Sequence, residues 1–225
     1  MVEQTRVPVG LIACAHGGTS MAQWSPAKKD QGGNSLYGSM LRQFQLAGGK
    51  VKGVLWYQGE SNANTVQQAK AYRGQLQLLI TSWRAEFSSG RTAFPFFWIQ
   101  LPNYNPADSV PPTNAGWATI RESMQAALAL PNTGQVVTID LGGVPPELHP
   151  RNKQDVGARL ARVVRKVAYG QNVLASGPTY RSHATRGDTA VVVFGNVAAG
   201  LRVRGDSLGG FAIAGADRRW VWANA

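Results

Sequence analysis

The chain has 225 residues, of which 44% are hydrophobic and 16% are charged. This length and composition exclude global disorder and predict one domain, or one domain with a small appendage. The formal net charge of +11 would suit a nucleic-acid-binding protein. However, the sequence has no zinc-finger spacing, no basic heptads and no interleaved aromatic and basic residues, so nucleic acid is not expected as a partner.

In chain order, short apolar runs alternate with helical patterns over the first two thirds of the sequence. Strands are predicted over residues 7–15, 51–57, 94–101 and 135–141. Helices are predicted over residues 37–46, 67–87, 117–130 and 152–169. Alternation of this kind predicts an α/β fold with a mostly parallel sheet flanked by helices.

From residue 173 the pattern changes to short strands separated by glycine-rich turns, without a helical pattern. These strands are predicted over residues 190–194, 201–204 and 211–214. We therefore expect a core domain over residues 1–172 and a small β-rich appendage over residues 173–225.

The basic residues, the cysteine and the apolar segments narrow the possible functions further. Cys14 is the single cysteine, which excludes an internal disulfide and cysteine metal clusters, and no metal or cofactor is expected. No apolar segment reaches membrane-spanning length and no signal-peptide core is visible, so no membrane partner is expected and localisation is left open. The basic residues that fall along one predicted helix are interpreted as its solvated face: Arg159, Arg162, Arg165 and Lys166.

Three polar clusters follow predicted strands, at the positions where parallel α/β sheets bind their ligands. The clusters are His16-Gly17-Gly18-Thr19-Ser20, Gln58-Gly59-Glu60-Ser61-Asn62, and Asp140 together with Glu147 and His149. They supply a histidine, carboxylates, an amide and tight glycine turns. These groups can provide the base, the orienting acid and the oxyanion donors of acyl transfer.

Three segments carry a resemblance to a known family. VPVGLIACAHGGTSMAQWSP, KGVLWYQGESNA and TIDLGGVPPELHPRNKQDVGARLA resemble consecutive segments of sialate O-acetylesterases. They are similar, less closely, to acetyl-xylan esterases of the SGNH hydrolase type. The resemblance extends over nearly the whole chain, including the β-rich part. It implies an SGNH-hydrolase-like, flavodoxin-like α/β core.

The resemblance also implies a role for each cluster. His149 would be the general base that takes the proton of a serine hydroxyl. The Gln58 side-chain amide and the Gly18 backbone N–H would form the oxyanion hole. Glu60 and Asp140 would orient neighbouring groups or offset the charge of the imidazolium. The residues expected to contact substrate are His16, Gly17, Gly18, Glu147 and Trp24.

The acid and the nucleophile of the triad stay open. Many SGNH hydrolases have an aspartate three residues before the histidine, but here that position is Pro146, and Glu147 lies two residues before His149. Family members carry the nucleophile in a Gly-Gln-Ser-Asn segment after an earlier, central strand, and this sequence has no such segment. The chain is therefore expected to be an internal fragment whose sheet has a gap, which a second copy could fill in a homo-oligomer.

Four possibilities remain for the nucleophile. Ser61 lies in Gly-Glu-Ser-Asn-Ala, which is close to a Gly-x-Ser-x-Gly elbow, and Ser20 follows a glycine turn. Ser207 lies in GDSLGG, which is interpreted as a hairpin turn because a strand pattern follows it. The last possibility is that the chain has no nucleophile.

These observations predict hydrolysis of short acyl esters, with an O-acetylated sugar as the small-molecule substrate. The reaction would proceed by serine attack, an acyl-enzyme and histidine-assisted hydrolysis. The first alternative is a carbohydrate-binding remnant of such an esterase, which keeps the pocket without a nucleophile. The second alternative is a basic interaction module that binds polyanions.

Overall fold

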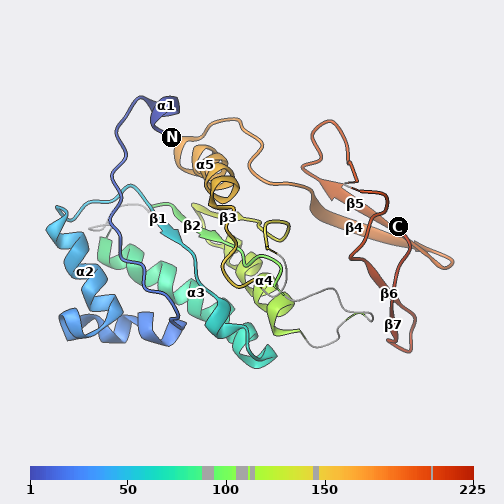
Figure 1. Ribbon diagram of the computed structural model, residues 1–225, viewed down its shortest axis with the longest axis horizontal. Helices are drawn as coiled ribbons and strands as arrows, with labels where there is room; N and C mark the ends of the chain where they lie inside the picture. Colours follow the sequence, from blue (N-terminus) through green and yellow to red (C-terminus); the bar gives the residue numbers. More distant parts are fainter. Residues whose placement is uncertain (88–93, 105–110, 112–114, 144–146, 204) are drawn as a thin grey trace.

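The described residues of the computed structural model are 1–87, 94–104, 111, 115–143, 147–203 and 205–225. Their centre is a three-stranded sheet in the order β1 (Val54–Trp56), β2 (Phe96–Ile99) and β3 (Thr133–Val136). Both neighbouring pairs are parallel, with Trp56 opposite Trp98 and Trp98 opposite Gln135. This confirms the predicted parallel sheet (Figure 1).

Helices cover both faces of this sheet (Figure 1). On one face pack α3 (Val66–Phe87) and α4 (Gly116–Ala126), and α2 (Leu36–Leu46) extends that layer. The opposite face is covered by α5 (Lys153–Tyr169). Within the described ranges, no helix has both the length and the apolar character needed to cross a bilayer. The short elements are α1 (Val2–Thr5) and the 3-10 helices Met21–Trp24, Pro26–Asn34, Glu60–Asn62 and Ala127–Ala129.

Strand β2 is buried on both faces because its side chains alternate between two apolar clusters. Phe96 and Trp98 belong to the cluster shared with α3 and α4, whereas Phe97 and Ile99 pack against α5. All four are at most 4% exposed. Burying a side chain of this size contributes about 1.5–3 kcal/mol through the hydrophobic effect. The Trp98 indole N–H also donates to Gln135 Oε1 at 2.8 Å, so its one polar group is paired.

One buried arginine fixes the amino ends of two strands. Arg84, near the end of α3, is 8% exposed, and burial lowers the pKa of its guanidinium. It donates to the carbonyl oxygens of Phe94, Pro131 and Asn132 at 2.7–3.1 Å. Phe94 precedes β2, and the other two residues precede β3. Arg84 therefore ties both strands to the helix that covers them.

The predicted helices begin and end close to the observed ones. Strands β1 and β2 are shorter than predicted, β3 begins two residues earlier than predicted and ends at Val136, and β5 extends one residue beyond its prediction at each end. The strand predicted over residues 7–15 is wrong, because these residues form no strand and almost all of them are exposed. An extended apolar segment becomes a strand only when another backbone pairs with it. Among the described residues, no strand pairs with this segment.

Two small antiparallel sheets follow the core. In the first, β4 (Thr179–Arg186) pairs with β5 (Thr189–Gly195), and in the second, β6 (Ala212–Ala214) pairs with β7 (Trp220–Trp222). The β-rich appendage is thus confirmed, whereas the domain boundary at residue 173 stays a prediction. The strand predicted over 201–204 is wrong for 201–203, which are exposed and form no strand, and residue 204 lies outside the described residues.

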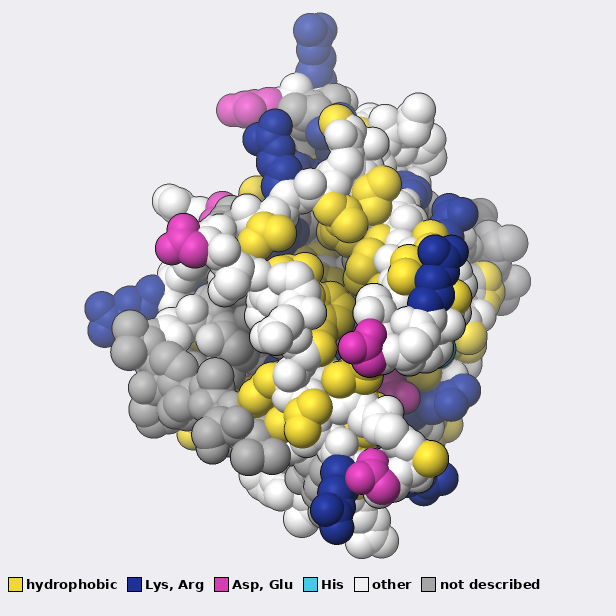
Figure 2. Space-filling model, turned by 90° about the vertical axis from the view of Figure 1, so that its right-hand side faces the viewer, with side chains coloured by type: hydrophobic (Ala, Val, Ile, Leu, Met, Phe, Trp, Pro, Cys, Tyr) yellow, Lys and Arg dark blue, Asp and Glu magenta, His cyan; other side chains and the backbone are white. Residues whose placement is uncertain are grey.

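The face that carries the two small sheets gathers hydrophobic side chains around a central depression (Figure 2). Trp220 and Trp222 lie opposite Ala214 and Ala212 in the register of β6 and β7, and both tryptophans are exposed. Other exposed hydrophobic residues of this part of the chain are Tyr180, Val191, Val193 and Leu201. The appendage therefore leaves much of its apolar surface uncovered.

Candidate active site

The carboxyl ends of the three parallel strands lie at one edge of the sheet, since neighbouring strands run in the same direction. Residues 57–62 follow β1, residues 100–104 follow β2 and residues 137–143 follow β3. The turn at residues 16–20 joins this edge, because it is hydrogen bonded to the residues after β1. The edge thus collects parts of all three polar clusters.

Gln58 is the centre of a buried hydrogen-bond network at this edge. The residue is 7% exposed, and its Nε2 donates to the Thr19 carbonyl and to Asn62 Oδ1, both at 2.9 Å. Asn62 Oδ1 also accepts the Met21 backbone N–H at 3.1 Å. Both N–H groups of the Gln58 amide are used inside the protein, and Oε1 is buried without a partner among the described residues. In this arrangement the amide holds the glycine turn and offers no N–H to a substrate.

The backbone of Gln58 is fixed as well. Tyr72, fully buried on α3, donates its hydroxyl to the Gln58 carbonyl at 2.9 Å and accepts the Trp56 indole N–H at 3.2 Å. Burial raises the pKa of the Tyr72 phenol well above its usual range. The phenol therefore stays protonated and continues to donate.

The glycine turn of the first cluster lies beside this network and is open to solvent. Gly18 has a φ of +69°, which favours glycine, and a Cβ built on it would meet nothing within 4 Å. Its backbone N–H donates to none of the described residues. Thr19 is buried, donates its hydroxyl to the His16 carbonyl at 3.0 Å and accepts the Trp24 indole N–H. The turn is therefore fixed to the core through Thr19, and the Gly18 N–H is not used within the described part of the protein.

Trp24 lies in the core rather than at an exposed surface. It is 3% exposed, and its ring meets Trp56 edge-on at a centroid distance of 5.3 Å. This packing leaves no ring face for stacking on a sugar, so the substrate contact expected for Trp24 does not fit its position. His16 and Gly17, which were expected to contact substrate from the same cluster, are exposed.

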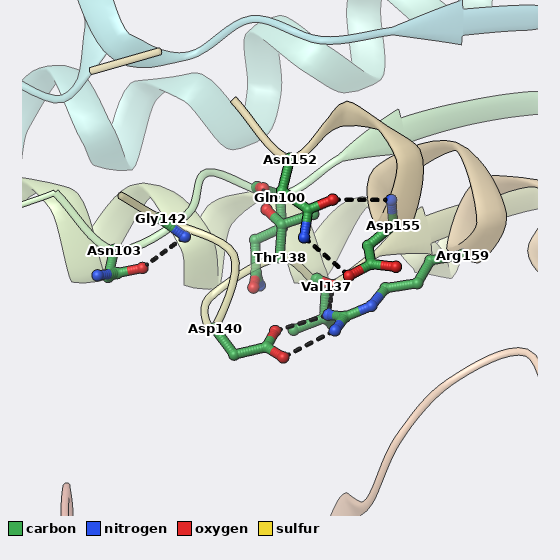
Figure 3. Close-up of polar contacts among 9 residues, drawn as sticks. All are labelled: Gln100, Asn103, Val137, Thr138, Asp140, Gly142, Asn152, Asp155 and Arg159. Atoms are coloured by element: carbon green, nitrogen blue, oxygen red, sulfur yellow. Dashed lines mark hydrogen bonds and ion pairs between the residues drawn. The ribbon is translucent and has the colours of Figure 1, made fainter. Parts of the chain in front are cut away.

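After β3, Asp140 forms an ion pair with helix α5. Its two carboxylate oxygens accept from Arg159 Nη1 and Nη2 at 2.6 and 2.7 Å, and Nη1 also donates to the Val137 carbonyl at 2.9 Å (Figure 3). The hydrogen bonds to Asp140 raise the pKa of Arg159. Arg159 therefore lies on the solvent-accessible side of α5, as expected, but its 34% exposed side chain is held in a bidentate contact that the sequence did not predict.

Two further bonds join the segments that follow β2 and β3. Thr138, fully buried, donates its hydroxyl to the Gln100 carbonyl. Asn103 Oδ1 accepts the Gly142 backbone N–H at 2.8 Å (Figure 3). A Cβ at Gly142 would lie 2.0 Å from this oxygen, so only glycine allows the close approach. The segment after β3 is therefore bound to the end of the neighbouring strand.

His149 lies on the exposed chain just before α5. Within the described ranges its ring makes no hydrogen bond, so the imidazole is accessible. Pro150, which follows it, is buried, and Asn152 caps α5 by accepting the Asp155 backbone N–H at 3.1 Å. The backbone next to the exposed ring is thus fixed by the helix start.

Glu147 is half-buried and pairs with Arg151 at 3.8 Å. A Cβ built on Gly143 would lie 1.8 Å from Glu147 Oε2, so the carboxylate packs directly against that glycine. The two carboxylates of the predicted third cluster therefore contact different residues. Asp140 faces Arg159, and Glu147 lies between Gly143 and Arg151.

A cation–π contact brings the start of α5 to the end of β1. Lys153 Nζ lies 5.3 Å from the centroid of the Tyr57 ring. Burial, and next the charge of Glu60, raise the pKa of Tyr57 to about 12. Tyr57 immediately precedes Gln58 and Lys153 follows soon after His149, so the second and third clusters approach the same part of the edge.

The three serines considered as nucleophiles have different surroundings. Ser20 Oγ donates to Gln23 Oε1 at 3.4 Å, and its backbone N–H donates to the same oxygen at 2.9 Å, so Ser20 caps a 3-10 helix. Ser61 is half-buried in the 3-10 turn after Gln58, where its hydroxyl bonds to no described residue. Ser207 is exposed, and the element after it is strand β6 rather than a helix, so it lacks the elbow geometry.

Cys14 is half-buried against the core near α2, and burial raises the pKa of its thiol. In the part of the chain that the structure describes, no three His, Cys, Asp or Glu side chains gather as they would around a metal ion.

The sequence interpretation missed the residues that hold the site together. Thr19 and Asn62 belong to the polar clusters, and their positions after predicted strands could have indicated that they lie at the site. Tyr72, Asn103 and Arg159 gave no such signal, because each acts on a residue distant in the sequence.

Comparison with known proteins places the chain among carbohydrate esterases. Residues 1–166 match the family described as carbohydrate esterase, sialic acid-specific acetylesterase. The sialate O-acetylesterase of Homo sapiens is 31% identical over 212 residues, which cover 79% of this chain and 39% of that protein. The sialate O-acetylesterase of Rattus norvegicus is 35% identical over 158 residues, which cover 64% of this chain and 28% of that protein. The chain thus spans less than half the length of these relatives.

A solved structure extends the likeness to the appendage. The crystal structure of a carbohydrate acetylesterase from Xanthomonas citri matches with a TM-score of 0.82 at 38% identity, covering 99% of this chain and 51% of that chain. The parallel sheet, its helices and the small antiparallel sheets therefore form the SGNH-type fold of carbohydrate acetylesterases. By its sequence and its fold, this chain belongs to the sialic acid-specific acetylesterase family of carbohydrate esterases.

Proposed function

We propose that this chain hydrolyses short acyl esters, with acetyl groups on O-acetylated sugars as substrate, through a serine acyl-enzyme. Membership of the acetylesterase family supports the reaction class. The observation that carries the proposal is the edge of the sheet where Gln58 bonds to the glycine turn and where Lys153, soon after His149, contacts Tyr57. At this edge, the turn has an N–H that could bind the carbonyl oxygen of an ester, and the accessible imidazole could act as a base.

The Gly18 backbone N–H is the proposed oxyanion donor. It bonds to none of the described residues, and the Cβ position beside it is open. Gln58 acts on this donor through Thr19, because its Nε2 holds the carbonyl of the residue that follows Gly18. A donor fixed in this way needs no rearrangement when negative charge develops on the carbonyl oxygen of the substrate.

His149 is the proposed general base. It would take the proton from a serine hydroxyl and return it to the leaving sugar oxygen. Glu147 is the carboxylate proposed to stabilise the imidazolium. Its contact with Arg151 at 3.8 Å is a weak surface pair, because Arg151 is almost fully exposed. Glu147 could therefore leave Arg151 and pair with the His149 imidazolium at a small cost in free energy.

The nucleophile would be Ser20 or Ser61. Ser20 lies two residues after the proposed oxyanion donor Gly18, and Ser61 lies in the turn that follows Gln58. Covalent labelling with a fluorophosphonate, followed by mass-spectrometric location of the adduct, would identify the reactive serine. Alanine variants of both residues would then show which one abolishes the adduct.

Carbohydrate binding without hydrolysis is the second candidate function. It is favoured by the surroundings of His149, since among the described residues neither a serine hydroxyl nor a carboxylate is hydrogen bonded to its ring. The Ser20 hydroxyl is also engaged, with Gln23. A remnant of this kind would bind an O-acetylated sugar and leave its ester intact.

Turnover of p-nitrophenyl acetate by the wild type and by His149→Ala separates the two functions. We expect the variant to lose roughly 100-fold or more in kcat, as is typical when a general base is removed. His183→Ala is the control, because His183 lies on the appendage, where its Nδ1 contacts the Tyr180 hydroxyl at 2.8 Å. Equal activity in wild type and His149→Ala would reject the esterase function. Binding of an O-acetylated sugar without turnover would then support the remnant.

A further inference from the structure

We propose that Arg159 and Asn103 are positioning residues for His149, which fix the chain that carries the imidazole at the carboxyl edge of the sheet. The inference rests on the proposed function, in which His149 is the base, and it adds the residues that determine where this base stands. Neither residue would touch the reacting atoms. Asn103 would act through Gly142, on the β3 side of His149, and Arg159 would act through α5, on its other side.

The ion pair between Asp140 and Arg159 closes the chain segment that contains His149. Asp140 follows β3, Arg159 lies within α5, and His149 stands between them in the sequence. The two N–H···O bonds, at 2.6 and 2.7 Å, form a planar fork that sets orientation as well as distance. The third bond of Arg159, to the Val137 carbonyl at 2.9 Å, attaches the same guanidinium to the end of β3 (Figure 3).

Asn103 provides a second anchor, from the neighbouring strand. Its Oδ1 accepts the Gly142 N–H at 2.8 Å, and the contact is so close that a side chain at Gly142 would collide with it. On the far side of His149, the Asn152 cap fixes the start of α5, with Asn152 Nδ2 also donating to Asp155 Oδ2 at 2.8 Å (Figure 3). The backbone is thus bound before and after His149, whereas the ring itself is exposed.

Because the ion pair is partly exposed, its effect on the position of His149 can be measured separately from its effect on the stability of the fold. The side chains of Arg159 and Asp140 are 34% and 45% exposed. Ion pairs at this exposure contribute little to the free energy of unfolding. Removing the pair should therefore leave the fold intact and release the segment that carries His149.

The test combines esterase kinetics with NMR signals of the His149 ring. The chain has three histidines, so these signals can be assigned with a His149→Gln variant. In Arg159→Gln we expect the ring signals to shift or broaden, and kcat for p-nitrophenyl acetate to fall roughly tenfold or more with little change in KM. Arg162→Gln is the matched control, since Arg162 is exposed on the same helix, and it should change neither readout.

Conservative variants distinguish a positioning role from a loss of structure. Asn103→Asp keeps an acceptor for the Gly142 N–H and should keep most of the wild-type kcat, whereas Asn103→Ala should behave like Arg159→Gln. The exchange of Asp140→Arg combined with Arg159→Asp should recover part of the kcat that each single exchange loses. The melting temperature of Arg159→Gln should stay within about 4 °C of the wild type.

Unchanged ring signals and unchanged kcat in both Arg159→Gln and Asn103→Ala would overturn the inference. If the wild type shows no turnover, the proposed function fails and the NMR comparison decides the inference alone. A ring signal that changes in Arg159→Gln but not in Arg162→Gln would then support positioning. Identical spectra in the two variants would reject it.

Discussion

Gln58 Nε2 donates to the Thr19 carbonyl at 2.9 Å across 39 residues of sequence, and this bond attaches the glycine turn to the end of β1. The same nitrogen donates to Asn62 Oδ1, so both amide protons are used. If the amide were turned over, Oε1 would face two acceptor oxygens and both bonds would be lost. The orientation of Gln58, and with it the position of the proposed oxyanion donor, is therefore determined by its hydrogen bonds.

Replacing Gln58 by glutamate should destabilise the fold strongly at neutral pH. A carboxylate would face the Thr19 carbonyl and Asn62 Oδ1 without a proton to share, in a buried position. We expect the free energy of unfolding at pH 7 to fall by about 3 kcal/mol or more. Burial should raise the pKa of the new carboxyl group above the ordinary value of about 4.3. The loss should therefore shrink as the pH falls below the raised pKa, because the protonated group can donate again.

Urea denaturation at pH 7 and pH 5 measures this difference. Gln67→Glu is the control, since Gln67 is exposed on α3 and should show no loss that depends on pH. If Gln58→Glu lost the same free energy of unfolding at both pH values, the hydrogen bonds donated by the Gln58 amide would not be what stabilises this network.

Tyr37→Phe should stabilise the protein. Tyr37 is fully buried on α2, and its hydroxyl has no hydrogen-bond partner among the described residues. Removing an unsatisfied polar group should raise the free energy of unfolding by about 1 kcal/mol at pH 7. Tyr169→Phe is the control for loss of a hydroxyl, since Tyr169 is exposed and its hydroxyl bonds to none of the described residues. A destabilised Tyr37→Phe protein would contradict the expectation.

The gain from Tyr37→Phe should also increase in alkaline solution. Burial, and next the charge of Glu86, raise the pKa of Tyr37 to about 12, whereas an unfolded tyrosine ionises near pH ~10. The stability contributed by the neutral phenol is fully present below the unfolded pKa and is lost as the pH rises through the folded pKa. The difference between variant and wild type should therefore widen between about pH 10 and 12, and urea titrations at pH 9 and 11 would detect it.

The helices could be predicted from the sequence because each carries apolar residues at helical spacing. Leu76, Leu79, Ile80 and Trp83 predicted α3, and all four are buried there. The segment over residues 7–15 has an equally clear strand pattern and forms no strand. Strand formation depends on a partner backbone, which the sequence of the segment itself does not encode.

The location of the polar clusters could be predicted, whereas their contacts could not. Parallel strands place the residues after each strand at one edge, so the topology alone brings the second and third clusters together. The Gln58 side chain points into the protein because the Thr19 carbonyl accepts its N–H. The pairing of Asp140 with Arg159 depends on how α5 packs across β3. Both depend on three-dimensional packing between segments that are distant in the sequence.

Replacing Gly134 and Gly157 by alanine should change the free energy of unfolding in opposite directions. At Gly134 in β3, an added Cβ would lie 2.3 Å from Val163 Cγ1 and 3.0 Å from Phe97 Cδ1, so Gly134→Ala should destabilise by about 1–3 kcal/mol. At Gly157 in α5, a Cβ would meet nothing within 4 Å. Gly157→Ala should therefore stabilise by about 0.5–1 kcal/mol, because alanine loses less backbone entropy in a helix. Thermal unfolding of both variants checks the sign, and a stabilised Gly134→Ala protein would show that α5 does not pack as closely on β3.

Arg84→Met should be among the most destabilising single changes in the core. It leaves the carbonyl oxygens of Phe94, Pro131 and Asn132 without their guanidinium donor, in a buried position between α3 and the sheet. We expect a loss of about 2–4 kcal/mol in the free energy of unfolding.

Arg84→Lys should fall between the wild type and Arg84→Met, because an ammonium group cannot reach the carbonyls of two strands with the same geometry. Arg73→Met is the matched control, since Arg73 is exposed on the same helix. Urea midpoints order the variants. If Arg84→Met unfolded at the same urea concentration as Arg73→Met, the amino ends of β2 and β3 would have to be held by their backbone pairing alone.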